Sequence, residues 1–287
     1  PDRLLRCAEA LRVGATVEQQ EKPYAPSRIR LTADPHRGAF RGTTENVSFL
    51  TLRADPLVKR DRVTLEIDSQ VLIAHKFPVH LRKVGGKWSV SEALPAQEKG
   101  SHRNGGFKDV FRNRVLFVYG TAGSAEENAW AYAKARFDAE SFWYRGNAAV
   151  DVVPDDSPLL KDKDRNVLLY GNEATNRAWK SLVGSEVAVR AGRVGLGSRT
   201  LQGDDLAVLA IVPRQGSERA SVAVVAPTGR AGAKLLERVP YFTPGAALPD
   251  VTVLRPGLLV GDAKGVAVAG FFGNDWSAAK GEWAWSE

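Results

Sequence analysis

The serine and histidine residues are the first candidates for chemistry, because a serine hydrolase needs an activated hydroxyl beside an imidazole. An α/β-hydrolase places its serine in a Gly-x-Ser-x-Gly turn, where the glycines leave room for a strained backbone. The chain contains no such motif, and its glycine-serine pairs at residues 100–101 and 197–198 lack the remaining glycine spacing. All four histidines, His36, His75, His80 and His102, precede residue 114. The sequence therefore predicts no catalytic residue within the chain.

The sequence also lacks the residue spacings that metal and nucleotide sites require. His75 and His80 flank Pro78, which argues against a helical ligand pair, and no cysteine or carboxylate cluster completes a zinc set. The acidic residues between 151 and 164 lack the Asp-x-Asp-x-Asp-Gly order of a calcium loop. The glycine-rich stretches 192–197 and 229–234 have neither P-loop nor Rossmann spacing. No metal ion or cofactor is expected.

Two turns hold the candidate binding residues. The first turn is Tyr119-Gly120-Thr121, and the second, 51 residues later, is Tyr170-Gly171-Asn172; each follows an apolar run. Ligands of open α/β sheets bind at the carboxyl ends of strands, where helix N-termini present free N–H groups. The predicted ligand-binding residues are Tyr119, Gly120, Thr121, Gly171, Asn172 and Asn176. A purely structural interpretation stays open, in which glycine permits the reversal, Thr121 or Asn172 caps the next helix, and the tyrosine packs on a neighbour.

The elements that would position these turns form two strand-turn-helix units. Residues 115–120 and 167–172 are continuous apolar runs, typical of strands covered on both faces, and residues 125–142 and 174–183 favour helices. Further strands are expected at 206–212, 220–226, 251–254 and 266–272, with another helix at 229–239. Residues 114–287 are therefore predicted to form an open, mostly parallel α/β layered domain, similar to Rossmann or flavodoxin-like folds.

The part of the chain before residue 93 has a different pattern. Short alternating runs rich in β-branched residues predict antiparallel strands at 28–32, 47–52, 62–67, 79–84 and 87–90, and Gly85-Gly86 indicates a two-residue hairpin. Apolar residues at helical spacing between 4 and 11 precede a polar, proline-containing stretch. The predicted organisation is a helix and linker at 1–27, a small antiparallel β-sandwich-like module at 28–92, a connecting loop at 93–113 and the α/β domain at 114–287.

Composition and charge limit the partners. The chain has 287 residues with 40 Lys and Arg against 33 Asp and Glu, a net charge of +7. Its basic residues alternate with acids, as at 59–62 and 161–165, whereas phosphate-binding surfaces concentrate cations on one face. This pattern argues against nucleic acid as a partner. No window approaches the roughly 18 apolar residues of a membrane-spanning helix, and the single cysteine, Cys7, excludes an internal disulfide.

Several segments resemble one family of enzymes. Residues 105–111, Gly-Gly-Phe-Lys-Asp-Val-Phe, precede the apolar run 115–120, and residues 165–176 read Arg-Asn-Val-Leu-Leu-Tyr-Gly-Asn-Glu-Ala-Thr-Asn. This order is similar to the region after the catalytic domain in some bacterial prolyl-oligopeptidase-like serine hydrolases, which are α/β-hydrolases; Gly106 stands where that family commonly has proline. Residues 46–52, 62–70 and 86–88 resemble the β module of the same proteins.

The resemblance implies an accessory, catalytically silent carboxyl-terminal segment. Its partner would be an upstream α/β-hydrolase catalytic domain that carries the nucleophile, acid and histidine before Pro1, in a secreted or periplasmic hydrolase or peptidase. The absence of methionine and the first residues Pro1-Asp2-Arg3 agree with a processed or excised piece. The alternative is a stand-alone protein that binds a small ligand at the turns around Gly120 and Gly171.

Overall fold

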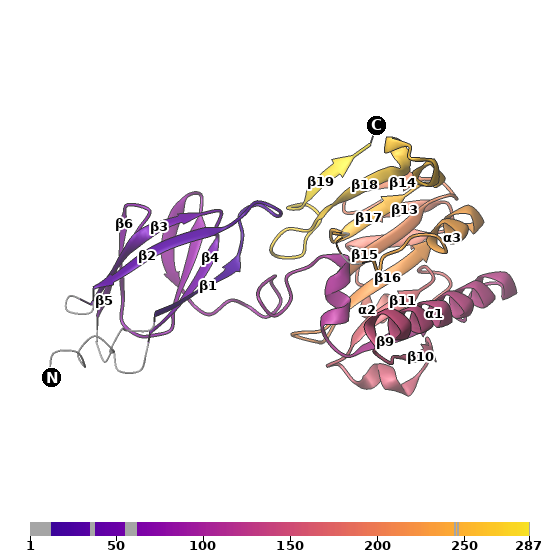
Figure 1. The fold of residues 1–287 in the computed structure, drawn as a ribbon, viewed down its shortest axis with the longest axis horizontal. Helices are drawn as coiled ribbons and strands as arrows, with labels where there is room; N and C mark the ends of the chain where they lie inside the picture. The colour runs from indigo at the N-terminus through magenta and orange to yellow at the C-terminus, as the bar shows by residue number, and fades with distance from the viewer. Residues whose placement is uncertain (1–12, 35–37, 55–61, 244, 246, 287) are drawn as a thin grey trace. The chain divides into compact units, whose positions relative to one another are not determined.

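The structure is a computed structural model that describes residues 13–34, 38–54, 62–243, 245 and 247–286. The chain folds into two compact units, residues 1–95 and 96–287. Figure 1 shows the first unit in indigo and violet and the second in magenta to yellow. Each unit has its own hydrophobic clusters. No helix among the described residues is long and apolar enough to cross a membrane.

The described residues of the first unit form eight strands in two sheets. These strands are β1 (Val13–Gln19), β2 (Arg28–Asp34), β3 (Ala39–Glu45), β4 (Phe49–Ala54), β5 (Val63–Ile67), β6 (Gln70–Ala74), β7 (Val79–Val84) and β8 (Lys87–Ser91). One sheet has the order β1-β4-β7-β8 and the other the order β2-β3-β5-β6. Apolar residues on their inner faces, such as Leu50 and Leu65, are fully buried in one core cluster.

Three features of this unit bear on the sequence-based expectations. The hairpin at Gly85-Gly86 is confirmed: both residues have positive φ, 56° and 77°, and Val84 pairs with Lys87. The strand β1 pairs with β4 inside the stretch that was expected to be a linker, while the helix expected between residues 4 and 11 lies outside the described residues. The pair β3–β5 is parallel, because β4 crosses to the other sheet between them.

The second unit is built on an eight-stranded sheet. In spatial order its strands are β10 (Asp151–Pro154), β9 (Val115–Tyr119), β11 (Asn166–Tyr170), β16 (Ser221–Pro227), β15 (Ala207–Pro213), β17 (Val251–Leu254), β18 (Val266–Phe271) and β19 (Glu282–Trp285). The first four strands run parallel. Every later neighbour pairs antiparallel, so the sheet is mixed.

The expectation of an open, mostly parallel Rossmann- or flavodoxin-like domain is therefore wrong. Residues 214–220 join β15 to β16, and a connection this short allows only an antiparallel pair, since a parallel pair needs a crossover of about a dozen residues or more. The helix expected at 174–183 is reduced to α2 (Trp179–Leu182). The next segment forms a separate antiparallel sheet of β12 (Val187–Arg190), β13 (Arg193–Leu196) and β14 (Arg199–Gln202).

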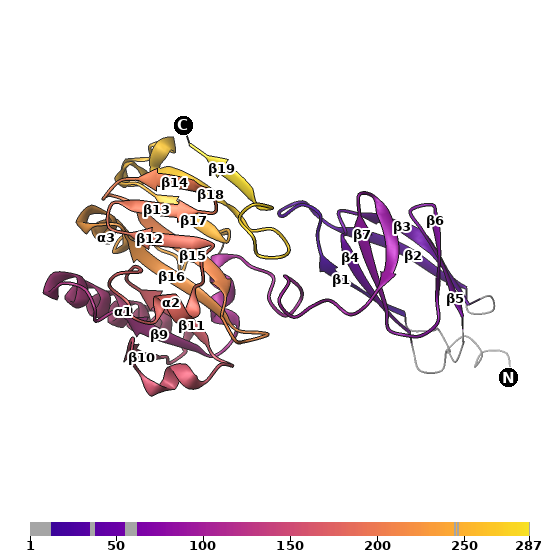
Figure 2. The same ribbon diagram turned by 180° about the vertical axis from the view of Figure 1, so that it is seen from behind.

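Both faces of the large sheet are covered. One face packs against α1 (Ala125–Gly146), α3 (Arg230–Leu236) and the 3-10 helix η1 (Phe107–Arg112). The other face packs against α2 and the small sheet of β12, β13 and β14. Figure 1 looks onto the face with α1 and α3, and Figure 2 shows the unit from behind. The remaining 3-10 helices are η2 (Pro158–Lys161), η3 (Pro256–Val260) and η4 (Ala263–Gly265).

A buried ion pair holds the start of the second unit in place. Lys99 Nζ pairs with the fully buried carboxylate of Asp250 and donates a hydrogen bond to the Phe272 carbonyl at 2.9 Å. The Gly106 N–H donates to Asp250 Oδ1 at 2.6 Å. A Cβ on Gly105 would lie 2.3 Å from the same oxygen, so this close approach requires glycine. The segment around Gly105, expected to be a connecting loop, is packed onto the sheet.

Candidate functional site

Parallel pairing brings the two predicted turns together. Tyr119 lies opposite Tyr170 in the β9–β11 ladder, so the turns that follow both strands meet at one edge of the sheet. The Gly120 N–H donates to the Tyr170 carbonyl at 3.0 Å. A Cβ on Gly120 would lie 2.3 Å from the Thr175 carbonyl oxygen. The close approach of the two turns is therefore what requires glycine at this position.

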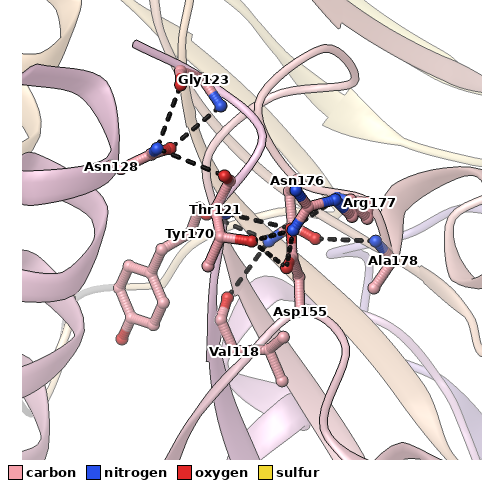
Figure 3. Close-up of polar contacts among 9 residues, drawn as sticks. All are labelled: Val118, Thr121, Gly123, Asn128, Asp155, Tyr170, Asn176, Arg177 and Ala178. Atoms are coloured by element: carbon pink, nitrogen blue, oxygen red, sulfur yellow. Dashed lines mark hydrogen bonds and ion pairs between the residues drawn. The ribbon is translucent and has the colours of Figure 1, made fainter. Parts of the chain in front are cut away.

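A buried carboxylate joins the two turns (Figure 3). Asp155, which follows β10, accepts hydrogen bonds from Thr121 N at 3.0 Å, Thr121 Oγ1 at 2.7 Å and Arg177 N at 2.7 Å. Its side chain is 0% exposed, whereas the guanidinium side chain of Arg177, at 3.5 Å, is 56% exposed. Arg177 Nη1 also donates to Thr121 Oγ1. The sequence analysis considered Asp155 only as one of the acidic residues between 151 and 164 and did not single it out as a buried group.

The two predicted asparagines bind the backbone of their own surroundings. Asn176 Nδ2 donates to the carbonyls of Val118 at 3.3 Å and Tyr170 at 3.1 Å, and its Oδ1 accepts from Ala178 N at 3.1 Å (Figure 3). Asn172 Nδ2 donates to the Pro227 carbonyl at 3.1 Å. These side chains stabilise the turns, since they satisfy buried polar groups of the main chain.

Helix α1 is capped by a residue other than the one considered in the sequence. Ser124 Oγ accepts from Glu127 N at 3.3 Å, and Glu127 Oε2 accepts from Ser124 N at 2.8 Å, which is a complete capping box. Thr121 therefore does not cap this helix. Tyr119 packs on Tyr132 of α1 with ring centroids 5.0 Å apart, as the structural interpretation of the turn expects.

A cavity of about 820 Å³ lies between α1 and α3, above the ends of β11 and β16. Its lining residues come from α1, α3 and the turns after both strands: Ser124, Glu126, Glu127, Ala129, Trp130, Ala133, Lys134, Phe137, Gly171, Asn172, Thr175, Pro227, Gly229, Arg230, Ala233, Lys234 and Glu237. Two of the predicted binding residues, Gly171 and Asn172, are therefore part of its wall. The other four lie at the same sheet edge but do not line the cavity: Tyr119, Gly120, Thr121 and Asn176.

A buried polar cluster extends from the cavity wall into the unit. Lys134 Nζ pairs with Asp138 Oδ1 at 2.7 Å, with side chains only 4% and 1% exposed. The Tyr241 hydroxyl donates to the other Asp138 oxygen, and the ammonium lies 4.8 Å from the Tyr241 ring centroid. Burial raises the pKa of the Asp138 carboxyl to about 6, and the neighbouring Lys134 ammonium limits this rise. Burial and the Asp138 charge raise the pKa of the Tyr170 hydroxyl.

Trp130, another residue of the lining, carries an unsatisfied donor. Its indole Nε1 is buried and has no hydrogen-bond partner among the described residues. Trp130 and Lys134 are four residues apart on α1, so their side chains share one face of the helix. At the first turn of α1, Glu126 Oε1 pairs with Arg230 Nε of α3 at 3.2 Å. The lining thus combines apolar side chains with six charged ones, which are Glu126, Glu127, Lys134, Arg230, Lys234 and Glu237.

Sequence reasoning missed the residues of α1 that line the cavity. Trp130, Lys134 and Phe137 recur at intervals of four and three, the spacing of one helix face. That spacing was a usable signal for a common face. It did not show that α3 stands opposite, because the partner helix is about 100 residues away and its position depends on strand order.

The described histidines lie in other surroundings. His80 Nδ1 lies 3.0 Å from the Thr51 hydroxyl in the first unit, and His102 Nε2 lies 3.0 Å from the Ala96 carbonyl oxygen. Among the residues that the structure describes, no group of three or more His, Cys, Asp or Glu side chains could hold a metal ion.

Comparison with known proteins gives no family assignment. The chain matches no protein-family model and no curated protein. The resemblance to the region after the catalytic domain of prolyl-oligopeptidase-like hydrolases therefore stays a prediction.

Proposed function

We propose that the unit at residues 96–287 is a binding module for a small molecule, which occupies the cavity between α1 and α3. The observation that carries this proposal is the cavity itself, about 820 Å³ in volume, at the carboxyl ends of the parallel strands β11 and β16. Ligand sites are typically cavities of about 300–1,000 Å³ with apolar walls and a few placed polar groups. The lining has both properties, because Trp130 and Phe137 are aromatic and Lys134 is charged.

The binding region differs from the one expected at the turns. The polar side chains of Thr121 and Asn176 bond to the chain itself, so they build the edge rather than offer free groups to a ligand. Gly171 and Asn172 contribute wall surface. The module therefore uses the same edge of the sheet, with its ligand displaced toward the helices.

A thermal-shift screen with a metabolite panel tests this function. A ligand at about 100 times its dissociation constant adds about 2.7 kcal/mol to the free energy of unfolding. Ala133→Trp fills the cavity from an exposed position of α1 and should abolish the shift. Ala231→Trp adds the same ring at an exposed position of α3 outside the lining and should keep it. A shift that survives Ala133→Trp, or a panel without any hit, would contradict the proposal.

A second candidate is the accessory, catalytically silent segment of a secreted or periplasmic serine hydrolase. Its support is the resemblance of residues 105–176 together with the aromatic surface of α1. Phe137, Trp143 and Tyr144 are 58%, 60% and 85% exposed, and large exposed aromatic groups are typical of surfaces that contact another protein. Under this proposal α1 packs beside an upstream α/β-hydrolase catalytic domain.

Labelling with a fluorophosphonate probe tests the second candidate. The isolated chain should remain unlabelled and should not hydrolyse p-nitrophenyl esters or peptide amides. Stoichiometric labelling of one serine would refute catalytic silence. The encoding frame upstream of Pro1 should contain a Gly-x-Ser-x-Gly turn, and its absence there would remove the proposed partner.

A further inference from the structure

The large sheet of the second unit ends at β19, next to β18 (Figure 1), and no strand that the structure describes pairs with the outer side of β19. On the inner side β19 pairs antiparallel with β18, and the Ser286 N–H donates to the Ala267 carbonyl at 3.0 Å. Hydrogen-bonded and non-hydrogen-bonded pairs alternate along an antiparallel ladder. Trp283 and Trp285 therefore stand in non-hydrogen-bonded pairs, and their main-chain N–H and C=O groups point outward. Such an open edge can pair with one more strand.

The side chains of the same two residues line a cavity at this edge. Trp283 and Trp285 are partly buried against the core on the face that carries β12, β13 and β14, whereas the alternate residues of β19, among them Glu282, are exposed on the other face. The cavity has a volume of about 500 Å³ and is also lined by the β13–β14 turn at 196–199 and by the loop before β19. Among the described strands of the large sheet, only β19 contributes to the lining, which places the cavity at the edge.

Arg199 is the charged residue of this lining. It is exposed, and its guanidinium carbon lies 4.6 Å from the ring centroid of Trp285. Two acids near the cavity have other partners, because the Asp275 carboxylate pairs with Lys280, and Glu186 Oε2 accepts a main-chain N–H of the loop before β19 at 2.7 Å. Among the residues that the structure describes, no carboxylate forms an ion pair with Arg199. The open edge therefore carries a positive charge that is available to a partner.

We propose that β19 binds an extended segment of a partner protein as an added antiparallel strand, with an acidic side chain of that segment at Arg199. Residues directly opposite each other in a ladder project to the same face. The partner residue opposite Trp285 thus lies beside Arg199, and the residue two positions later, opposite Trp283, lies at the cavity. The segment is recognised by an acidic residue, any residue and an apolar residue in this order, and by four main-chain hydrogen bonds to the two tryptophans.

A second copy of the chain fits this edge less well than an acidic segment does. Two β19 strands could pair antiparallel around Ala284, but each copy would bring another Arg199 to the tryptophan face and no acid. Glu282 of either copy projects to the opposite face. Like charges across an interface disfavour association, so charge complementarity selects the acidic partner. This site is separate from the cavity between α1 and α3 and does not depend on the proposed function.

Short peptides test the charge of the partner. The parent is N-acetyl-Thr-Glu-Thr-Val-Thr-amide, in which the glutamate lies opposite Trp285 and the valine opposite Trp283. Binding to the whole chain is measured by isothermal titration calorimetry. Hydrogen bonds to a carboxylate are stronger than those to an amide, but water screens an exposed pair, so glutamine in place of the glutamate should weaken binding by about 3- to 10-fold. Lysine at the same position should weaken it further.

N-methylation of the parent peptide tests strand addition. A methyl group on the nitrogen of the glutamate or the valine removes an N–H that pairs with β19, and should weaken binding by about 10-fold or more. The matched control carries the methyl group on the central threonine, whose N–H points away from β19. Its affinity should stay within about threefold of that of the parent.

Variants of the chain identify the cation. In Arg199→Met the glutamate and glutamine peptides should bind equally. Arg193→Met removes an exposed positive charge from β13 outside the lining and should change the preference for glutamate by less than about twofold. If Arg199→Met does not fold, the peptide series decides alone.

Four results with the wild-type chain would overturn the inference. They are a dissociation constant above about 1 mM for the parent peptide, equal binding of the glutamate and glutamine peptides, tightest binding of the lysine peptide, and equal effects of the three methyl groups. A preference for glutamate that survives in Arg199→Met would also overturn it. Dimerisation in sedimentation equilibrium that the parent peptide reverses would assign the edge to a second copy of the chain instead.

Discussion

Removing the carboxylate of Asp155 should destabilise the second unit strongly. The Asp155→Ala variant leaves the main-chain N–H groups of Thr121 and Arg177 without acceptors, at positions that are partly buried. Each orphaned donor costs about 1–3 kcal/mol, and partial burial favours the lower half, so we expect a loss of about 2–4 kcal/mol. The ion pair adds little, because the Arg177 side chain is 56% exposed and its charge is screened by water.

Asp155→Asn provides the sharper comparison. One amide oxygen can accept both N–H groups, while the amide nitrogen can donate to the Thr121 hydroxyl, so the loss should be about 1 kcal/mol. Asp156→Asn changes the exposed neighbour and should stay within about 0.5 kcal/mol of wild type. Urea unfolding followed by tryptophan emission measures the effect, since every tryptophan except Trp88 lies at residues 96–287. Equal losses for the alanine and asparagine variants would refute the hydrogen-bond argument.

Two further changes test the surroundings of the cavity. Because the pKa of Asp138 is raised from 3.8 to about 6, the folded chain binds this proton more tightly than the unfolded chain. The free energy of unfolding should therefore fall by up to about 3 kcal/mol as pH rises from about 4 to about 6. The Asp138→Asn variant should lack this pH dependence. A difference in stability between wild type and variant that does not change with pH would contradict the assignment. Gly120→Ala places a Cβ against the Thr175 carbonyl and should lower the free energy of unfolding in urea by about 1–3 kcal/mol. Gly146→Ala, whose new Cβ would lie 3.9 Å from the Phe142 ring, should not lower it. Equal effects of the two changes would show that the turns separate freely.

Local patterns in the sequence predicted the long apolar strands but not their arrangement, and they missed β1, β3, β6, β10, β12, β13, β14 and β19. The apolar runs around Val115 and Val167 became the adjacent parallel strands β9 and β11, and the run at Val251 became β17 with the expected bounds. Strand direction depends on how each connection crosses the sheet, which apolar runs do not encode. Buried strands of a mixed sheet and of a parallel sheet have the same continuous apolar character when both faces are covered.

Of the six predicted binding residues, Gly171 and Asn172 line the cavity, and the ligand-binding role of all six stays a prediction. Gly120 and Gly171 stand where the two turns meet, as strand ends in a parallel pair must. The role of Asp155 could not be inferred, because its partners Thr121 and Arg177 are 34 and 22 residues away. In sequence it stands beside Asp156 in an acidic stretch, and nothing there distinguishes the buried carboxylate from the exposed one.

The width of the cavity depends on residues that do not line it. Helix α3 approaches the sheet so closely that a Cβ on Gly232 would lie 2.1 Å from the Leu206 carbonyl oxygen. On the other side, the turn before α1 is fixed by Asp155 through Thr121, and by Asn128, whose amide bonds the Gly123 N–H and carbonyl at 2.9 and 3.0 Å (Figure 3). Both helices therefore begin from turns held by buried hydrogen bonds or close backbone contacts. Under the proposed binding function, the predicted turn residues act indirectly, because they hold the turn from which α1 begins.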